Sequence, residues 1–549
     1  MVSAVTSREF IVNLYLNLNR EKRGDLMTDK IDDVKNGYSR FANSEFRAYQ
    51  KDAIEYILES KKKIVVACLP CGAGKSLIGT VAAGVMGGGT YLVHSKSLQV
   101  QLQEDFIELP ILWGRGNYKC LRSEGRATCG ECSHSANNPC VNKASRCEYI
   151  IAKRIAINSP VRILNYQFWI TEANYVGGFG NESLVIVDEA DALENVMAGF
   201  VGLEFTEGML RNLRIKPPRY KTTSSAKALD DWREWARVAG GKVSAMISSL
   251  DGELGDSGYD LRPSTSDLIR RRERLTGIRR KLLMFIECVD STWLYDERTW
   301  DGRTTISFKP TWITRELAEK YVWGHGEKFV LMSATFPPLP VMAKTLGINM
   351  GDIAYKEFPS TFPPENRPVI LNPVANLVWK DMEVESGKVV QEIKVLLEKH
   401  KGEKGLIHTV SYKLTSLVMA IGDPRLVTHN GSDKIMAVDE FKNSTEPLVM
   451  VSPSSERGIS LDGEMCRWVV WVKAPFLSLA DKLVNARIYK SPVGNLWYKA
   501  NTIMSVVQGC GRAVRSKEDY ASVYILDQQI VKLLTENPSL APMWFREAI

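Results

Sequence analysis

The segment PCGAGKS, residues 70–76, has the residue types that hold a nucleotide phosphate. It lies between the apolar run KKIVVAC and the run LIGTVAAGV, so it joins a predicted strand to a predicted helix. Backbone N–H groups at such a helix start can bind phosphate oxygens, here those of Gly72, Ala73 and Gly74. Lys75 then supplies positive charge to the β and γ phosphates, and Ser76 a hydroxyl ligand for Mg²⁺. Because Leu69 replaces the usual first glycine, a simple tight turn is the alternative interpretation.

A second apolar run, LVIVDEAD at 184–191, ends in adjacent carboxylates. Asp188 is placed to bind Mg²⁺ through water, and Glu189 to orient or deprotonate the attacking water. A solvated acidic strand end would look similar, but this one follows the phosphate segment in the order that a nucleotide site requires. The two segments together predict ATP hydrolysis with Mg²⁺.

A third segment, QGCGRAVRSKEDY at 508–520, carries two arginines three residues apart. Arg512 and Arg515 therefore share one face of a predicted helix. Cations are needed where charge develops on a γ-phosphate, so we expect these arginines to act on the nucleotide held by the other half of the chain. A basic surface helix is the alternative.

Two sets of short apolar runs, each ending in polar or glycine-rich loops, predict the elements that position these residues. Such runs are typical of parallel sheets covered on both faces. The first set is 62–70, 89–95, 161–165, 183–190 and 328–335, and the second is 405–410, 446–453, 467–475 and 521–527. We therefore predict an α/β protein with two parallel sheets in tandem. Residues 204–300 lack strand alternation and are predicted to be helical.

The length of 549 residues, at roughly 150 residues per domain, predicts three or four domains. A hydrophobic content of 44% and a charged content of 25% exclude a disordered or collagen-like chain. No apolar run is long enough to cross a bilayer, and the first residues, MVSAVTSREF, do not resemble a secretory signal. We expect a cytoplasmic protein without membrane contact, with the nucleus as the open alternative. The net charge of +7 is compatible with a polyanionic partner.

Five of the ten cysteines lie close together: Cys120, Cys129, Cys132, Cys140 and Cys147. A single dense cluster in a long chain favours a metal site over a disulfide framework. Cys129 and Cys132 form the tightest pair, and Cys140 is the substitute for either. Spacing alone favours zinc, because CxxC followed by further cysteines is a zinc-ribbon pattern.

The ordered motifs resemble those of superfamily-2 helicases, and within them the XPD/DinG family of iron–sulfur DNA helicases. The resemblance covers about residues 45 to 530 and rests on eight segments: FRAYQ (46–50), PCGAGKS (70–76), YLVHSKSLQVQL (91–102), DEAD (188–191), LMSAT (331–335), GLIHTVSY (405–412), SSERGISLDG (454–463) and QGCGRAVRS (508–516). The departures from the family pattern are Cys71, Ala73, Arg457 and Ser460.

The resemblance implies two tandem RecA-like motor domains, the first interrupted by a metal-cluster insert and a helical Arch-like insert. We expect the first motor domain at 1–110, 159–203 and 306–345, the cluster insert at 111–158, the Arch-like insert at 204–305, and the second motor domain at 346–549. It also implies further nucleotide-site residues, namely Arg47, Gln50, Glu456, Gly458 and Gln508.

WGRGNYKC (113–120) and the segment that begins at Cys147 resemble the family's cluster anchors, which makes Cys120 and Cys147 the outer ligands of a [4Fe–4S] cluster. The implied cofactors are therefore ATP, Mg²⁺ and this cluster. The implied partners are single-stranded DNA and duplex/single-strand junctions, with 5′-to-3′ movement and a monomeric protein. An ATP-driven translocase that does not separate strands and an ATP-switched nucleic-acid-binding scaffold are the alternatives.

Nucleic-acid contacts are predicted in two places. The run RRRERLTGIRRK at 270–281 has seven basic residues and one acidic residue, which indicates either a solvated helix face or the wall of a strand channel. Four nearby tryptophans could stack on bases or pack in a helical core: Trp232, Trp235, Trp293 and Trp300. His94 and Ser95 end a strand beside the nucleotide site and are candidates for phosphate contacts.

Overall fold

The computed structural model describes residues 27–121, 127–132, 146–223, 225–256, 263–378, 380–430, 434–453, 461, 463–511, 514 and 517–549. Five predicted site residues lie outside this part of the chain: Cys140, Glu456, Gly458, Arg512 and Arg515.

The first sheet is parallel, as predicted, and contains six strands, one more than the five predicted runs. Their order is β3 (Val161–Asn165), β2 (Gly89–Val93), β4 (Glu182–Asp188), β8 (Gly326–Ser333), β1 (Ile64–Cys68) and β9 (Ile353–Glu357). The expected domain division is wrong at one strand. We assigned residues 346–549 to the second motor domain, but β9, which falls in this range, pairs with β1 of the first sheet. The chain therefore completes the first sheet before it enters the second.

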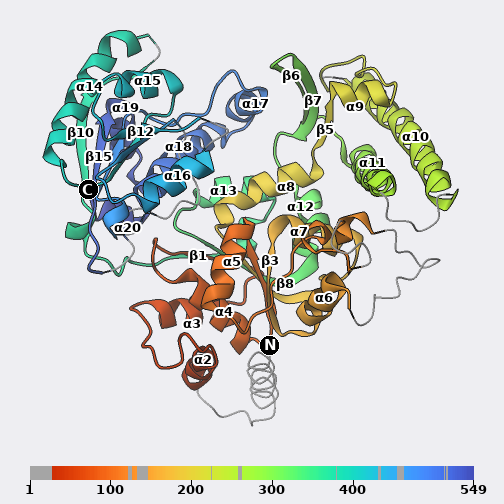
Figure 1. The fold of residues 1–549 in the computed structure, drawn as a ribbon, viewed down its shortest axis with the longest axis horizontal. Helices are drawn as coiled ribbons and strands as arrows, with labels where there is room; N and C mark the ends of the chain where they lie inside the picture. Colours follow the sequence, from red (N-terminus) through yellow and green to blue (C-terminus); the bar gives the residue numbers. More distant parts are fainter. Residues whose placement is uncertain are drawn as a thin grey trace.

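The second sheet is also six-stranded and parallel. Its order is β10 (Val369–Ala375), β15 (Ser522–Asp527), β14 (Trp468–Trp471), β11 (Gly405–His408), β13 (Val449–Ser452) and β12 (Leu426–Thr428). The prediction of two parallel-sheet α/β domains is confirmed. Figure 1 shows the two sheets in separate lobes, with the chain ending in the second.

Helices cover both faces of each sheet because alternate strand residues enter separate hydrophobic cores. One face of the first sheet packs against α2 (Met27–Asn36), α3 (Gln50–Glu59), α4 (Lys75–Val85) and α5 (Lys96–Asp105). The other face packs against α6 (Glu148–Asn158), α7 (Tyr166–Tyr175), α8 (Leu193–Val201), α12 (Arg315–Tyr321) and α13 (Leu339–Leu346). Burial on both faces explains why the strands are almost continuously apolar.

The second sheet is covered in the same way. On one face lie α14 (Met382–Lys399) and α15 (Tyr412–Met419). On the other lie α16 (Lys434–Asn443), α18 (Gly494–Cys510), α19 (Gln528–Glu536) and α20 (Met543–Arg546). A further helix, α17 (Lys482–Lys490), contributes to a small cluster with Trp312 and Trp497 between the two lobes. None of the described helices combines the length and apolar character needed to cross a membrane.

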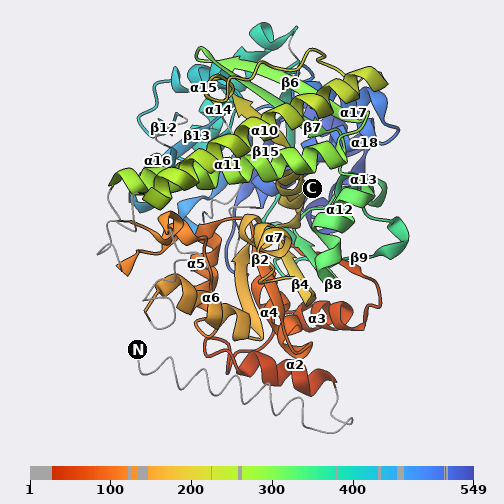
Figure 2. The ribbon, with the colours of Figure 1, turned by 90° about the vertical axis from the view of Figure 1, so that its right-hand side faces the viewer.

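The second insert, the region between α8 and α12, is not purely helical as predicted. Its helices are α9 (Glu207–Asn212), α10 (Ala226–Asp256) and α11 (Pro263–Cys288). They accompany an antiparallel sheet of β5 (Leu203–Thr206), β7 (Arg303–Pro310) and β6 (Trp293–Trp300). The sheet was missed because its strands mix charged residues and threonines with apolar ones. Figure 2 shows α10 and α11 running side by side across the molecule.

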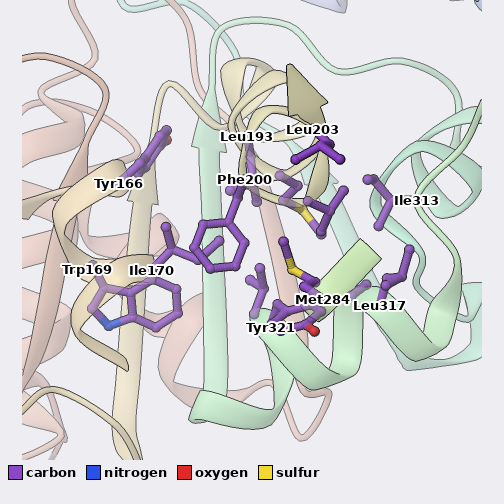
Figure 3. Packing of buried hydrophobic residues seen from close by; sticks show 14 of the residues in the cluster. Tyr166, Trp169, Ile170, Leu193, Phe200, Leu203, Met284, Ile313, Leu317 and Tyr321 are labelled. Carbon is purple, nitrogen blue, oxygen red and sulfur yellow. The ribbon is translucent and has the colours of Figure 1, made fainter. Parts of the chain in front are cut away.

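A single hydrophobic cluster joins this insert to the first sheet. Phe200 of α8 belongs to this cluster, and its ring centroid lies 5.7 Å from those of both Tyr175 and Tyr321. Figure 3 shows Phe200 between Trp169 and Ile170 of α7 on one side and Tyr321 and Met284 on the other. The insert therefore shares its core with the first sheet.

We expect Phe200→Ala to lower the free energy of unfolding by about 3–5 kcal/mol, because a buried aromatic ring is replaced by a cavity. Urea unfolding followed by circular dichroism measures the change. Val384→Ala is the control, since Val384 is 80% exposed on α14 and its truncation should change stability by less than about 0.5 kcal/mol. Equal stability of the two variants would contradict a shared core at Phe200.

Candidate functional site

The predicted phosphate loop connects β1 to α4, at the edge of the sheet where parallel strands end. Gly72 and Gly74 have φ angles of 74° and 78°, in the left-handed region that glycine adopts without strain. Gly74 directly precedes α4, so Lys75 and Ser76 begin the helix as predicted. The Lys75 ammonium donates to the Pro70 carbonyl at 3.4 Å, which keeps its charge over the loop.

Arg47 and Gln50 both bind the phosphate loop. The Gln50 amide donates to the Ala73 carbonyl at 2.9 Å, and the Arg47 guanidinium donates to the Gly72 carbonyl at 2.8 Å. The Arg47 N–H also donates to the Gln50 side-chain oxygen at 2.9 Å. A side chain at Gly74 would collide with the Gln50 amide, so the loop and this pair fit closely together.

Asp188 ends β4 with its carboxylate held on both sides. Its Oδ2 accepts from the Tyr91 hydroxyl and its Oδ1 from the Glu189 N–H, both at 2.9 Å. Burial raises the pKa of Asp188, and the nearby positive charge of Lys75 opposes that shift. Glu189 has a left-handed φ of 53°, which turns the chain sharply after the strand. The phosphate-loop lysine is therefore near enough to the acidic strand end to act on its carboxylate.

Tyr91 is a site residue that sequence reasoning missed. It is fully buried on β2, and its hydroxyl donates to Asp188 Oδ2 at 2.9 Å; burial raises the pKa of Tyr91, an effect that the neighbouring Ser76 side chain opposes. Ser76 and Asp188 thus come together around one phenol, and a hydroxyl beside a carboxylate is the oxygen donor set that suits Mg²⁺. A tyrosine in an apolar strand has no sequence signal that distinguishes this position from an ordinary core residue.

The LMSAT segment links the acidic strand end to the second lobe. The Ser333 hydroxyl donates to Asp191 Oδ1 at 2.8 Å, and the Gln508 amide of α18 donates to the Thr335 hydroxyl at 2.9 Å. Between them, the Trp544 indole N–H donates to the Ala334 carbonyl at 3.0 Å. Three consecutive residues therefore contact the acidic motif, the C-terminal helix and the helix that carries Gln508.

The phosphate loop also touches the second lobe directly. A methyl group added at Gly511 would lie 2.6 Å from the Cys71 sulfur, so the Gly511 backbone packs closely against the Cys71 side chain. Cys71 and Cys510 both line a small cavity between the lobes. Arg512 follows Gly511 in the sequence, although it lies outside the described residues together with Arg515.

The predicted metal ligands are only partly brought together. The sulfur atoms of Cys129 and Cys147 are 3.7 Å apart. The pKa of the Cys129 thiol is raised to about 12 by burial, then by Cys147, with smaller contributions from Cys120 and Cys132. Within the described residues, however, no group of three or more His, Cys, Asp or Glu side chains is arranged to hold a metal ion. The cluster therefore stays a prediction.

The predicted nucleic-acid residues differ in their surroundings. Trp232, Trp235 and Trp293 are buried in the core of the second insert, which contradicts their proposed stacking on bases. Ser95 caps α5 by accepting from the Leu98 N–H at 3.3 Å.

In the basic run of α11, Arg270 pairs with Glu131 at 2.7 Å. This pair connects α11 to the loop between Cys129 and Cys132.

Comparison with known proteins identifies the fold. Residues 384–548 match the helicase C-terminal domain family. No match was found among curated protein sequences. The chain is similar to a solved XPD helicase, with a TM-score of 0.58, 15% identity, and coverage of 91% of this chain and 99% of that one. It is similar to S. tokodaii Xpd4, with a TM-score of 0.55, 13% identity, and coverage of 90% and 98%.

An XPD structure solved in the apo form gives a TM-score of 0.54, with 16% identity and coverage of 90% and 98%. At these identities the likeness shows the fold, and it extends over nearly the whole chain. The predicted resemblance is therefore confirmed for the fold: residues 384–548 match the helicase C-terminal domain family, and the chain is folded like the solved XPD helicases.

Proposed function

We propose that this protein is an ATP-dependent DNA helicase that moves along a single strand and separates duplex DNA. One observation carries the proposal: the acidic strand end is hydrogen-bonded through Ser333 and Thr335 to Gln508 of the other lobe. A nucleotide bound beside Asp188 would thus be in contact with a chain of polar groups that ends in the second lobe. Such a link allows hydrolysis to change how the two lobes sit together.

In the proposed reaction, the backbone around Gly72 and Gly74 and the Lys75 charge bind the phosphates, while Arg47 and Gln50 hold the loop. Ser76 and Asp188 would hold Mg²⁺, which when bound neutralises phosphate charge. Glu189 would take a proton from the attacking water.

Residues of the second lobe complete the proposed site: Glu456, Gly458, Gln508, Arg512 and Arg515. Arg512 and Arg515 would stabilise the charge that develops on the transferred phosphoryl group. The close approach of Gly511 to Cys71 supports this role, because it brings the start of the arginine segment to the phosphate loop.

We further propose that Cys120, Cys129, Cys132 and Cys147 hold a [4Fe–4S] cluster, with Cys140 as the substitute ligand. The 3.7 Å separation of two of the sulfurs and the effect of the other two on the pKa of Cys129 support a common site. Crowded thiols without a cation resist ionisation, and a metal relieves this by binding them as thiolates. Zinc is the alternative metal.

Strand displacement on partial duplexes tests the proposed function. We expect ATP-dependent release of the displaced strand from a duplex with a 5′ single-stranded tail, and little release from one with a 3′ tail. Strand-stimulated ATP hydrolysis without displacement on either substrate would indicate a translocase that remodels bound proteins. ATP binding without stimulated hydrolysis would indicate a nucleic-acid-binding scaffold.

Two variants separate nucleotide binding from hydrolysis. Lys75→Ala removes the phosphate-binding charge and should weaken both. Glu189→Gln removes only the base, so ATP should still bind while strand-stimulated hydrolysis falls by at least about 100-fold. A nucleotide-binding titration with a fluorescent ATP analogue and a phosphate-release assay give the two readouts. Turnover by Glu189→Gln at the wild-type rate would refute the assignment of the base.

The contact between the lobes is tested at Gln508 and Thr335. Gln508→Ala and Thr335→Val each remove one partner of the 2.9 Å hydrogen bond, and each should lower strand-stimulated kcat by about 2- to 10-fold. The double variant should be no slower than the slower single variant, because the same bond is lost. Losses that multiply in the double variant would show that the two side chains act independently.

Single Cys→Ser variants test the metal ligands. Cys120→Ser, Cys129→Ser, Cys132→Ser and Cys147→Ser should each lower bound iron and abolish strand displacement. ATP hydrolysis should survive in part, since the cysteines lie outside the nucleotide site. Cys140→Ser serves as the control and should retain its iron. Stoichiometric zinc in place of iron in the anaerobically purified protein would assign the other metal.

A further inference from the structure

Trp300 differs from the other three tryptophans of the second insert. Its side chain is 86% exposed, whereas Trp232, Trp235 and Trp293 are buried. It is the last residue of β6, and Asp301 and Gly302 connect it to β7 with positive φ angles of 48° and 66°. Two left-handed residues are typical of the tight turn that matches strand twist in a hairpin. Trp300 is therefore held at the end of a short, well-defined hairpin.

The strand register places an arginine beside this ring. Trp300 is directly opposite Arg303, and side chains of opposed residues project from the same face of an antiparallel pair. Arg303 is exposed and forms no ion pair within the described part of the chain. Two positions back, Arg298 projects from the same face. On the opposite face, Tyr295 and Phe308 are buried in the core.

The polar face of the hairpin contacts the second lobe. Arg298 Nη2 pairs with Asp481 Oδ2 at 2.6 Å, and Lys482 Nζ pairs with Asp296 Oδ1 at 3.7 Å. Asp481 caps α17 and Lys482 begins it. Figure 1 shows the hairpin of β6 and β7 between α17 on one side and the helices of the second insert on the other. Trp300 and Arg303 extend this face past the contact, toward the tip.

We propose that Trp300 and Arg303 form a binding site for one nucleotide of a single strand. In this site, Trp300 stacks on the base and Arg303 binds a phosphate. The inference rests on the proposed function, because it assigns a contact to the strand that the helicase would move along. An aromatic ring beside an unpaired cation is what recognition of a single strand without sequence preference requires. A hydrophobic protein segment would use the ring but leave the arginine without a partner.

The hairpin would also move together with the second lobe and so change the position of the bound nucleic-acid strand. Its anchor residues Arg298 and Asp296 are paired with α17, which belongs to the lobe that carries Gln508. A movement of that lobe would therefore shift the tip together with any base stacked on it.

Fluorescence anisotropy with a labelled single-stranded oligonucleotide tests the site on the full-length protein. Trp300→Ala should weaken binding by roughly 5- to 150-fold, whereas Trp300→Phe should retain most of the affinity. The same measurement on a strand of abasic sites should show no difference between wild type and Trp300→Ala. Arg303→Ala should weaken binding to both strands and reduce the salt dependence by about one phosphate contact.

Exposed Val384, on α14, provides the control, and Val384→Ala should bind both strands like the wild type. Wild-type affinity of Trp300→Ala for the base-bearing strand would overturn the inference while leaving the proposed function intact, and would reassign the ring to a protein partner. An equal loss on base-bearing and abasic strands would also overturn stacking. A wild-type protein that binds no single strand would refute the proposed function itself.

Discussion

The segment from Ser333 to Thr335 connects the first lobe to the second. It begins at the last residue of β8, which lies between β1 and β4 in the first sheet, so it is placed between the phosphate loop and the acidic motif. Within three residues it binds Asp191, Trp544 and Gln508. Polar groups in such a buried position are costly to leave unpaired, so the loss of any of the three contacts would be unfavourable. The arrangement makes this short segment a direct link between the acidic motif and the second lobe.

Parallel topology explains why residues far apart in sequence meet here. All strands of the first sheet end at one edge, and ligands bind α/β proteins at that edge. The phosphate loop, Asp188 and the LMSAT segment each lie at the carboxyl end of a strand, so the sheet brings them to one edge. The second lobe adds its residues through α18 and the C-terminal helix α20. The two inserts follow α5 and α8 in the sequence.

Much of the site could be predicted because its chemistry restricts residue type and spacing. Glycines with positive φ, a lysine at a helix start and a carboxylate at a strand end leave a local pattern. The contacts of Tyr91 and Trp544 leave none, since each is one aromatic residue in an apolar segment and its partner is distant in the chain. The placement of β9 was wrong for a similar reason. Strand pairing is a long-range contact, and a short run after α13 reads equally well as the start of either sheet.

A structure of the protein with Mg²⁺ and a non-hydrolysable ATP analogue tests the central claim, that one nucleotide is bound by both lobes. The account predicts phosphates within hydrogen-bond distance of the backbone N–H groups of residues 72–74, with a side chain of residues 508–516 reaching the γ-phosphate. An analogue bound by the first lobe alone, with the segment after Gln508 turned away from it, would contradict the account.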